Sequence, residues 1–146
     1  MNAPDPRPVA PHIAEMHRWA ATPHVWGQSD CMLVLADWIQ QVHGLDPAAD
    51  VRGTYWDALS CQQVTGFMRD PMSVAVRYAE ENAGLSRGND LRVGDVGLLR
   101  LADEPRWAVG GMFLGSAWGF KGLSGAATRL PQLVQVEAFW SVGYEV

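Results

Sequence analysis

The sequence contains one clear candidate for chemistry, a cysteine at the start of an expected helix. Cys31 follows the residues Trp26-Gly27-Gln28-Ser29-Asp30, and the run after it, residues 32–42, has a helical period. Ser29 or Asp30 is a natural cap for this helix. Unpaired backbone N–H groups and the positive end of the helix dipole then surround the thiol. Such surroundings lower the pKa of a cysteine, so the pattern predicts a candidate nucleophile.

A cysteine nucleophile also needs a general base near its thiol, and the chain has four histidines. His43 follows on the same expected helix, roughly 18 Å from Cys31 at 1.5 Å per residue. No spacing brings His12 or His17 to the thiol. His24 lies upstream of Cys31 in a proline-containing loop, where contact with the thiol is geometrically possible. His24 is therefore the candidate base, and a surface histidine on a loop is the alternative.

The cysteines show no pattern of a metal site. Cys31 and Cys61 form no CxxC pair and no cluster with histidine, so we expect no zinc site, and nothing else indicates a cofactor. We expect both thiols to be free. Cys61 lies in a polar run and is expected to be structural. For Cys31, packing of a small apolar side chain at the helix start is the alternative to chemistry.

Composition limits the possible functions. The chain has 146 residues, of which 48% are apolar and seven are tryptophan, enough for one domain with a substantial core. A formal charge of −5 and the absence of a basic run argue against nucleic acid as a partner. No apolar stretch approaches the ~20 residues of a membrane span. Residues 1–10 are rich in proline and unlike a signal peptide, and predict an extended arm that could dock on a partner. Residues 11–146 are expected to form one domain.

The expected elements divide the chain into a helical half followed by a sheet. Apolar spacing, prolines and glycines predict helices over residues 11–22, 31–43, 55–59 and 71–83. Short apolar runs predict strands over 96–101, 107–114, 117–120 and 134–144, with a turn at 103–105 and a hairpin or contact loop within 115–122. Helices followed by a small antiparallel sheet or half-barrel make an α+β fold.

The aromatic residues are expected to lie mainly in the core. Trp19, Trp38 and Trp56 fall on or beside the expected helices. The sheet half contains Trp107, Trp118, Phe120 and Trp140. Some of these four are candidates for protein contacts, since aromatic residues are enriched there.

The order of these motifs resembles the NlpC-type branch of the papain-like cysteine peptidases, which cut peptide bonds in bacterial cell walls. In that family Asp-Cys begins the central helix, as Asp30-Cys31 does, and Gly-Asp opens the barrel, as Gly94-Asp95 does. The resemblance implies a papain-like fold with Cys31 as nucleophile. The base of that family is a histidine at the start of the second strand, the position that Val109 occupies here. No histidine follows His43.

A second resemblance, to phage-encoded relatives, rests on three further motifs. These are Ala36-Asp37-Trp38, Gly44-Leu45-Asp46-Pro47 and Arg52-Gly53-Thr54-Tyr55. Such relatives are encoded among the late tail genes of siphophages and gene transfer agents, and are similar to hub or tail-tip peptidases.

Together, the resemblances and the missing histidine imply a structural component of a phage tail tip, a catalytically impaired relative of the peptidases. It is expected in the virion, made in the host cytoplasm, with other tail-tip proteins as partners and peptidoglycan as a further contact. The alternative is an active cell-wall peptidase or amidase that uses Cys31. A small-molecule or peptide-binding domain unrelated to phage is a third interpretation.

Overall fold

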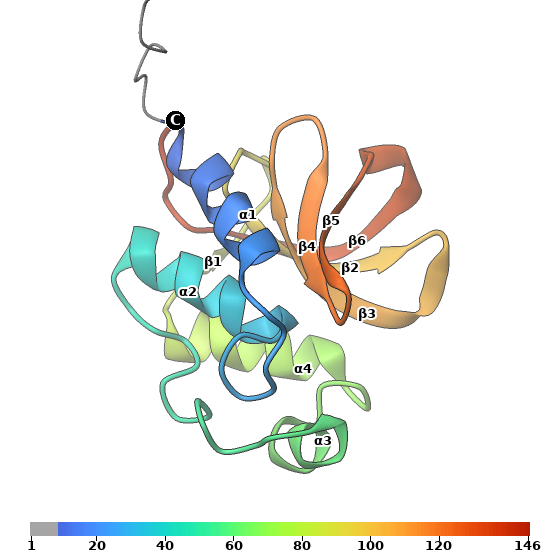
Figure 1. Ribbon diagram of the computed structural model, residues 1–146. Coiled ribbons are helices and arrows are strands. Elements are labelled where there is room, and N and C mark those ends of the chain that lie inside the picture. The colour runs from blue at the N-terminus through green and yellow to red at the C-terminus, as the bar shows by residue number, and fades with distance from the viewer. Residues whose placement is uncertain (1–8) are drawn as a thin grey trace, which may run out of the picture.

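The fold is described from a computed structural model, which covers residues 9–146 (Figure 1). Residues 1–8, most of the predicted arm, lie outside the described residues. Over 9–146 the chain forms four α-helices and a π-helical turn: α1 (Pro11–Ala21), α2 (Cys31–His43), α3 (Ala58–Thr65), α4 (Pro71–Val76) and η1 (Arg77–Asn82). It also forms six strands and a short 3-10 helix: β1 (Ser86–Arg87), β2 (Val96–Leu101), β3 (Glu104–Phe113), β4 (Trp118–Gly122), β5 (Gly125–Arg129), η2 (Pro131–Leu133) and β6 (Val134–Ser141).

Side-chain caps determine where three of the helices begin. Asp30 caps α2, which ends at Gly44 in the left-handed region with φ 94°. Asp70 caps α4, with Pro71 at its first position. Asp57 and Ser60 form a capping box, so α3 begins at Ala58 rather than within residues 55–57. The predicted helix over 55–59 is therefore wrong in position.

The strands form one antiparallel sheet in the order β1-β6-β2-β3-β4-β5. The prediction of an α+β fold is confirmed, and β2 has the predicted bounds. β3 begins earlier than predicted, because Leu101 already pairs with Glu104 across a two-residue hairpin. Residues 115–122 contain β4, which makes a hairpin with β5. β1 and β5 had not been predicted.

The helices pack on the sheet, with α1 against β4 and β5, α2 against β3 and β4, and α4 against β2 (Figure 1). The contact of α2 with β3 needs a glycine. A Cβ atom at Gly110 would lie 2.9 Å from the Leu35 side chain.

The core contains most of the predicted aromatic residues. Trp19, Trp38, Trp118, Phe120 and Trp140 are all buried. The Trp38 indole N–H donates to the Gly94 carbonyl at 2.8 Å and so ties α2 to the start of β2. Trp56 is 74% exposed, so its predicted core position is wrong, because it precedes α3 instead of lying on its packed face. Trp107 is 42% exposed.

One buried lysine joins α1 to the sheet. Lys121 of β4 is fully buried, and its ammonium donates to the carbonyls of Trp19 and Thr22 at 2.6 and 2.5 Å. These carbonyls lie at the C-terminal end of α1, where a cation is favourable. Burial lowers the pKa of Lys121, and the nearby Arg18 charge lowers it further.

None of the helices in the described part of the chain has the length and apolar character needed to cross a membrane.

Candidate functional site

The site is built on the start of α2, where the carboxylate of Asp30 is fully engaged. Asp30 is 1% exposed. One of its oxygens accepts from the backbone N–H groups of Met32 and Leu33, both at 3.1 Å. The other accepts from the N–H of Gly27 at 2.9 Å and from the hydroxyl of Tyr55 at 2.6 Å. With four donors, this carboxylate is occupied by structural hydrogen bonds.

Gly27 brings the preceding loop close to Tyr55. Its φ is +80°, and a Cβ atom there would lie 2.1 Å from the Tyr55 carbonyl oxygen. The Gly27 carbonyl also accepts from the N–H of Gly53 at 2.9 Å. The Trp-Gly-x-x-Asp-Cys motif, residues 26–31, therefore packs directly against the Arg-Gly-x-Tyr motif, residues 52–55.

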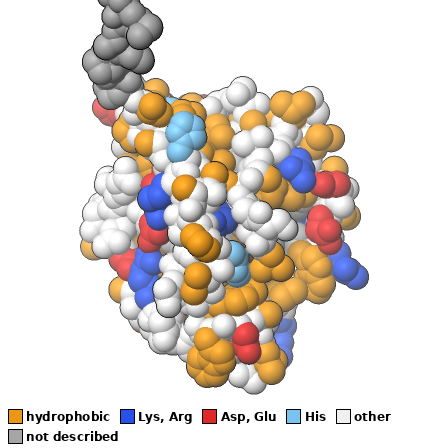
Figure 2. Space-filling model, viewed as in Figure 1, with side chains coloured by type: hydrophobic (Ala, Val, Ile, Leu, Met, Phe, Trp, Pro, Cys, Tyr) orange, Lys and Arg blue, Asp and Glu red, His pale blue; other side chains and the backbone are white. Residues whose placement is uncertain are grey.

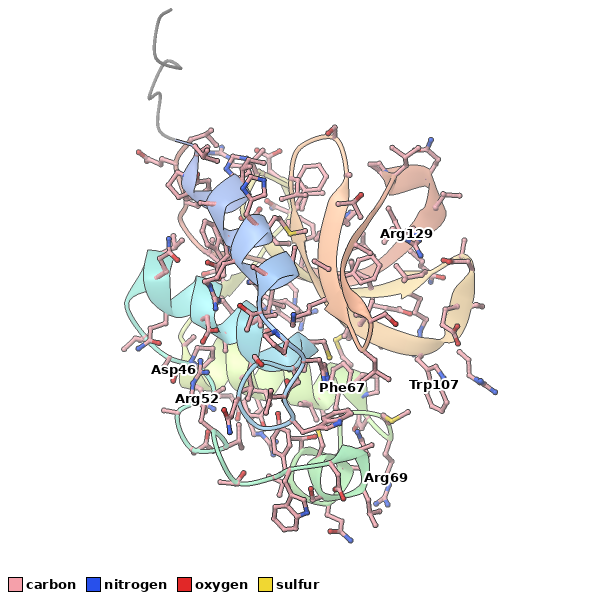
Figure 3. All side chains as sticks on the ribbon, viewed as in Figure 1. Asp46, Arg52, Phe67, Arg69, Trp107 and Arg129 are labelled. Atoms are coloured by element: carbon pink, nitrogen blue, oxygen red, sulfur yellow. The ribbon has the colours of Figure 1, made fainter. Side chains whose placement is uncertain are left out.

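A second cluster joins the remaining motif residues by ion pairs. Arg52 contacts Asp46 at 2.7 Å and Asp37 at 2.9 Å, and Arg18 contacts Asp37 at 3.0 Å. Figure 3 shows Asp46 and Arg52 side by side in the loop region after α2. The Arg52 guanidinium lowers the pKa of Asp46. This cluster fixes the loop against α1 and α2.

Cys31 is the first residue of α2 and is only partly exposed. Its thiol has no hydrogen-bond partner within residues 9–146. Burial, and to a smaller extent the Asp30 charge, raises its pKa to about 12. The N–H groups of Cys31 and Met32 lower the pKa by a smaller amount. The predicted lowering of the Cys31 pKa is therefore wrong, because burial outweighs the helix start.

Cys31 lines a cavity of about 640 Å³ between the helices and the sheet. The wall is mostly apolar and is contributed by α2, α3, α4 and strands of the sheet. Val109 of β3 lines the same cavity. Cys31 and Val109 thus belong to the wall of one cavity.

His24 also lines this cavity, and its ring packs edge-on against Trp26 with 4.7 Å between ring centroids. No hydrogen bond joins His24 to the Cys31 thiol. His43 lies at the far end of α2, His17 is exposed, and His12 is paired with the hydroxyl of Tyr144 at 2.9 Å. Of the four histidines, only His24 shares the cavity with the thiol.

Both cysteines are free, as predicted. Cys61 lines the cavity from α3, and its sulfur lies 3.9 Å from the Thr65 hydroxyl. Burial raises the pKa of Cys61. Over residues 9–146 no group of three or more His, Cys, Asp or Glu side chains could hold a metal ion.

Two important side chains were not given a role from the sequence. Tyr55 was quoted only as part of a motif, yet its hydroxyl binds Asp30. Lys121 was read as part of a glycine-rich loop, yet it binds the end of α1. A signal in the sequence was available for Tyr55 alone, since it belongs to one of the short motifs singled out there.

Comparison with known proteins identifies one family. A family model described as a domain of unknown function, DUF6950, matches residues 10–142, so the chain belongs to this family. No curated protein and no solved structure matches the chain.

Proposed function

We propose that this member of the DUF6950 family is a non-hydrolytic component of a phage tail tip, built on an NlpC-type papain-like scaffold. One observation carries the proposal. Val109 and Cys31 line the same apolar cavity, and the pKa of the thiol is raised to about 12. A cysteine peptidase needs a thiolate and a base at this place. Here the raised pKa favours the protonated thiol at neutral pH, and the resemblance assigns the position of the base to Val109.

The arrangement of elements supports the papain-like part of the proposal. A cysteine begins a buried helix, α2, which packs on the strand that contains Val109. Asp30 and Gly94-Asp95 match the motifs quoted for the NlpC-type peptidases. Loss of general acid–base assistance costs roughly 10²–10⁴-fold in rate. Such a loss makes a structural role the better fit for this scaffold.

The tail-tip part of the proposal rests on the motifs shared with phage relatives and on exposed apolar residues. Trp56 and Leu59, at the start of α3, are 74% and 67% exposed. Figure 2 shows hydrophobic side chains gathered around α3 on this face of the molecule. Aromatic residues of this kind are enriched in protein contacts. We therefore place other tail-tip proteins, in the virion, as the partners.

Hydrolysis of peptidoglycan tests the catalytic part. We expect no release of new amino termini from peptidoglycan or its stem peptides by the wild type, and the same result with Cys31→Ala. Release that disappears in Cys31→Ala would contradict the proposal. Val109→His restores a base on the cavity wall, and weak hydrolysis by this variant that needs Cys31 would support an ancestral site.

Alkylation against pH tests the state of the thiol. In the Cys61→Ala background, the alkylation rate of Cys31 should rise about tenfold per pH unit through pH 9, because the pKa lies near 12. A rate that levels off below pH 8 would mean an activated thiolate. That result would favour the peptidase.

Particle composition tests the location. The chain should be found at the tail tip by electron microscopy of particles purified from cells that carry the gene. Its absence from such particles, shown by mass spectrometry, would contradict the tail-tip assignment.

An active peptidase is the second candidate, because His24 lines the same cavity as Cys31. It requires the loop of His24 to bring the ring to the thiol. If the wild type hydrolyses peptidoglycan, His24→Ala should abolish this activity, whereas His17→Ala, on the exposed side of α1, should not.

A further inference from the structure

The cavity between the helices and the sheet has the size of a ligand site. Its volume of about 640 Å³ lies within the range of roughly 300–1,000 Å³ that is usual for small-molecule pockets. Its wall includes apolar side chains of α2 and α4, such as Leu35 and Val74, and of β2 and β3, such as Leu98 and Val109. We propose that this cavity binds an uncharged, hydrocarbon-like ligand.

The charged side chains in the wall are either hydrogen-bonded to other protein groups or exposed, which argues for an uncharged ligand. Asp30 accepts four hydrogen bonds, and the ammonium of Lys121 donates to two carbonyls of α1 and the loop after it. Arg129 pairs with Asp103 at 3.1 Å. Glu104 is exposed at the hairpin of β2 and β3. A charged ligand would lose its hydration inside without gaining an opposite charge.

Three polar side chains in the wall, those of Tyr55, Thr65 and Gln62, are engaged as well, which argues against a peptide. The Tyr55 hydroxyl donates to Asp30, and the Thr65 hydroxyl donates to the Cys61 carbonyl. The side-chain oxygen of Gln62 accepts from the N–H of Met68. An extended peptide carries an N–H and a C=O on nearly every residue, and each needs a partner when buried. A molecule with few polar groups fits this wall better.

The apolar lining continues to the surface, so such a ligand can enter. Met68, Trp107 and Leu123 line the cavity and are 45%, 42% and 72% exposed. Figure 3 shows Trp107 on the sheet and Phe67 beside α3, from the two halves of the molecule that enclose the cavity. Figure 2 shows hydrophobic side chains on this face below the strands. These three exposed apolar side chains offer a hydrocarbon an apolar path into the cavity.

Binding of an uncharged fluorescent probe, N-phenyl-1-naphthylamine, tests the proposal on the full chain. The matched variants are Val109→Trp and Val136→Trp. Both valines pair with Leu99 of β2, from opposite sides, and only Val109 lines the cavity. We expect saturable binding to the wild type and to Val136→Trp, and at least tenfold weaker binding to Val109→Trp. Equal binding to all three, or no saturable binding, would overturn the proposal.

A variant at the entrance covers the case in which Val109→Trp does not fold. Leu123→Asp places a charge on an exposed position of the entrance, and Leu130→Asp is its control, since Leu130 is 50% exposed and outside the lining. Leu123→Asp should weaken the probe at least threefold, and Leu130→Asp should not. An equal effect of both would overturn the proposal.

Competition identifies the class and source of the ligand. Displacement of the probe by dodecanol indicates a free apolar molecule, and co-sedimentation with phosphatidylcholine vesicles that Val109→Trp abolishes indicates an acyl chain of a lipid. Either supports the proposal. Displacement by a peptidoglycan stem peptide, or tighter binding of the anionic 8-anilino-1-naphthalenesulfonate than of the uncharged probe, would overturn it. These readouts are independent of hydrolysis and of the location in particles, so this inference and the proposed function can fail separately.

Discussion

Two neighbouring residues at the start of α2 have opposite surroundings. Asp30 is enclosed by four hydrogen-bond donors from its own helix, the preceding loop and Tyr55. Cys31, the next residue, faces an apolar cavity, and its thiol has no hydrogen-bond partner in the described part of the chain. The hydrogen-bonding capacity of Asp30 is thus filled, whereas the thiol that was expected to do chemistry has no polar partner.

This difference shows what the motif around Cys31 accomplishes. Hydrogen bonds of Gly27 and Asp30 join the loop, the helix and the Tyr55 segment. None of these contacts prepares the thiol for attack. The motif thus has a structural role that is independent of any reaction, and its presence does not by itself indicate catalysis.

The largest expected effect is on the Asp30 side. Asp30→Ala leaves buried donors without an acceptor and should lower the free energy of unfolding by about 4 kcal/mol. Urea denaturation measures this change. Asp57→Ala is the control, because Asp57 caps α3 from a more exposed position and should cost only about 1 kcal/mol. Equal decreases in the free energy of unfolding of the two variants would show that the buried hydrogen bonds of Asp30 add nothing beyond an ordinary helix cap.

A somewhat smaller effect is expected at Gly27. Gly27→Ala forces an alanine into positive φ, with its Cβ against the Tyr55 carbonyl, and should cost about 3 kcal/mol. Thermal unfolding gives the comparison with Gly53→Ala. Gly53 also has positive φ, but its Cβ would meet no atom within 4 Å. We expect Gly53→Ala to lose about 1 kcal/mol, and the two values would coincide if the close approach to Tyr55 were unimportant.

Removal of one donor should have an intermediate effect. Tyr55→Phe deletes the hydroxyl that donates to Asp30 and should lower the free energy of unfolding by about 2 kcal/mol. In a double-mutant cycle with Asp30→Ala, the two losses should be strongly non-additive, because they remove the same bond. Additive losses would show that the Tyr55 hydroxyl acts elsewhere. Tyr78→Phe, whose hydroxyl accepts from Arg77, is the matched control.

The smallest effect is expected at Cys31. Cys31→Ala removes only a sulfur atom from the cavity wall and should change the free energy of unfolding by less than about 1 kcal/mol. If Cys31→Ala lowered the free energy of unfolding as much as Asp30→Ala in the same urea experiment, the thiol would support the fold. The proposed difference between the two residues would then be wrong.

Stability should fall in acid, partly through the cluster around Asp46. Its pKa is lowered by Arg52, so its contribution is fully present above the ordinary pKa of 3.8 and is lost as the pH falls through its folded-state value. Asp46→Asn should therefore be less stable than the wild type at pH 7. The difference should shrink toward pH 3, as measured by urea denaturation at each pH. A difference that stays constant with pH would contradict the ion pair.

Local signals predicted the parts of the fold that local chemistry determines. The cap at Asp30 and the glycine at position 44 gave the bounds of α2, and the apolar run over 96–101 gave β2. β1 has two residues, and β5 consists of small and polar residues on the sheet edge, so neither has an apolar pattern to detect.

The chemistry of the candidate site could not be predicted from the motif around Cys31. The motif indicates a lowered pKa for the thiol, whereas the structure raises it. The pKa of the thiol depends on how deeply the surrounding segments bury it, and these segments lie far apart in the sequence. The cavity has the same origin, since its wall is assembled from nearly every element of the chain.

The contact of Lys121 with the end of α1 bears on the order in which the chain folds. The lysine and the Trp19 carbonyl that it binds are 102 residues apart. During synthesis α1 leaves the ribosome before β4, which carries the lysine that binds the end of α1. Long-range contacts of this kind form late. Helix α1 is thus made well before the contact that holds it is complete, and until then its face with Trp19 remains open to solvent or to a chaperone.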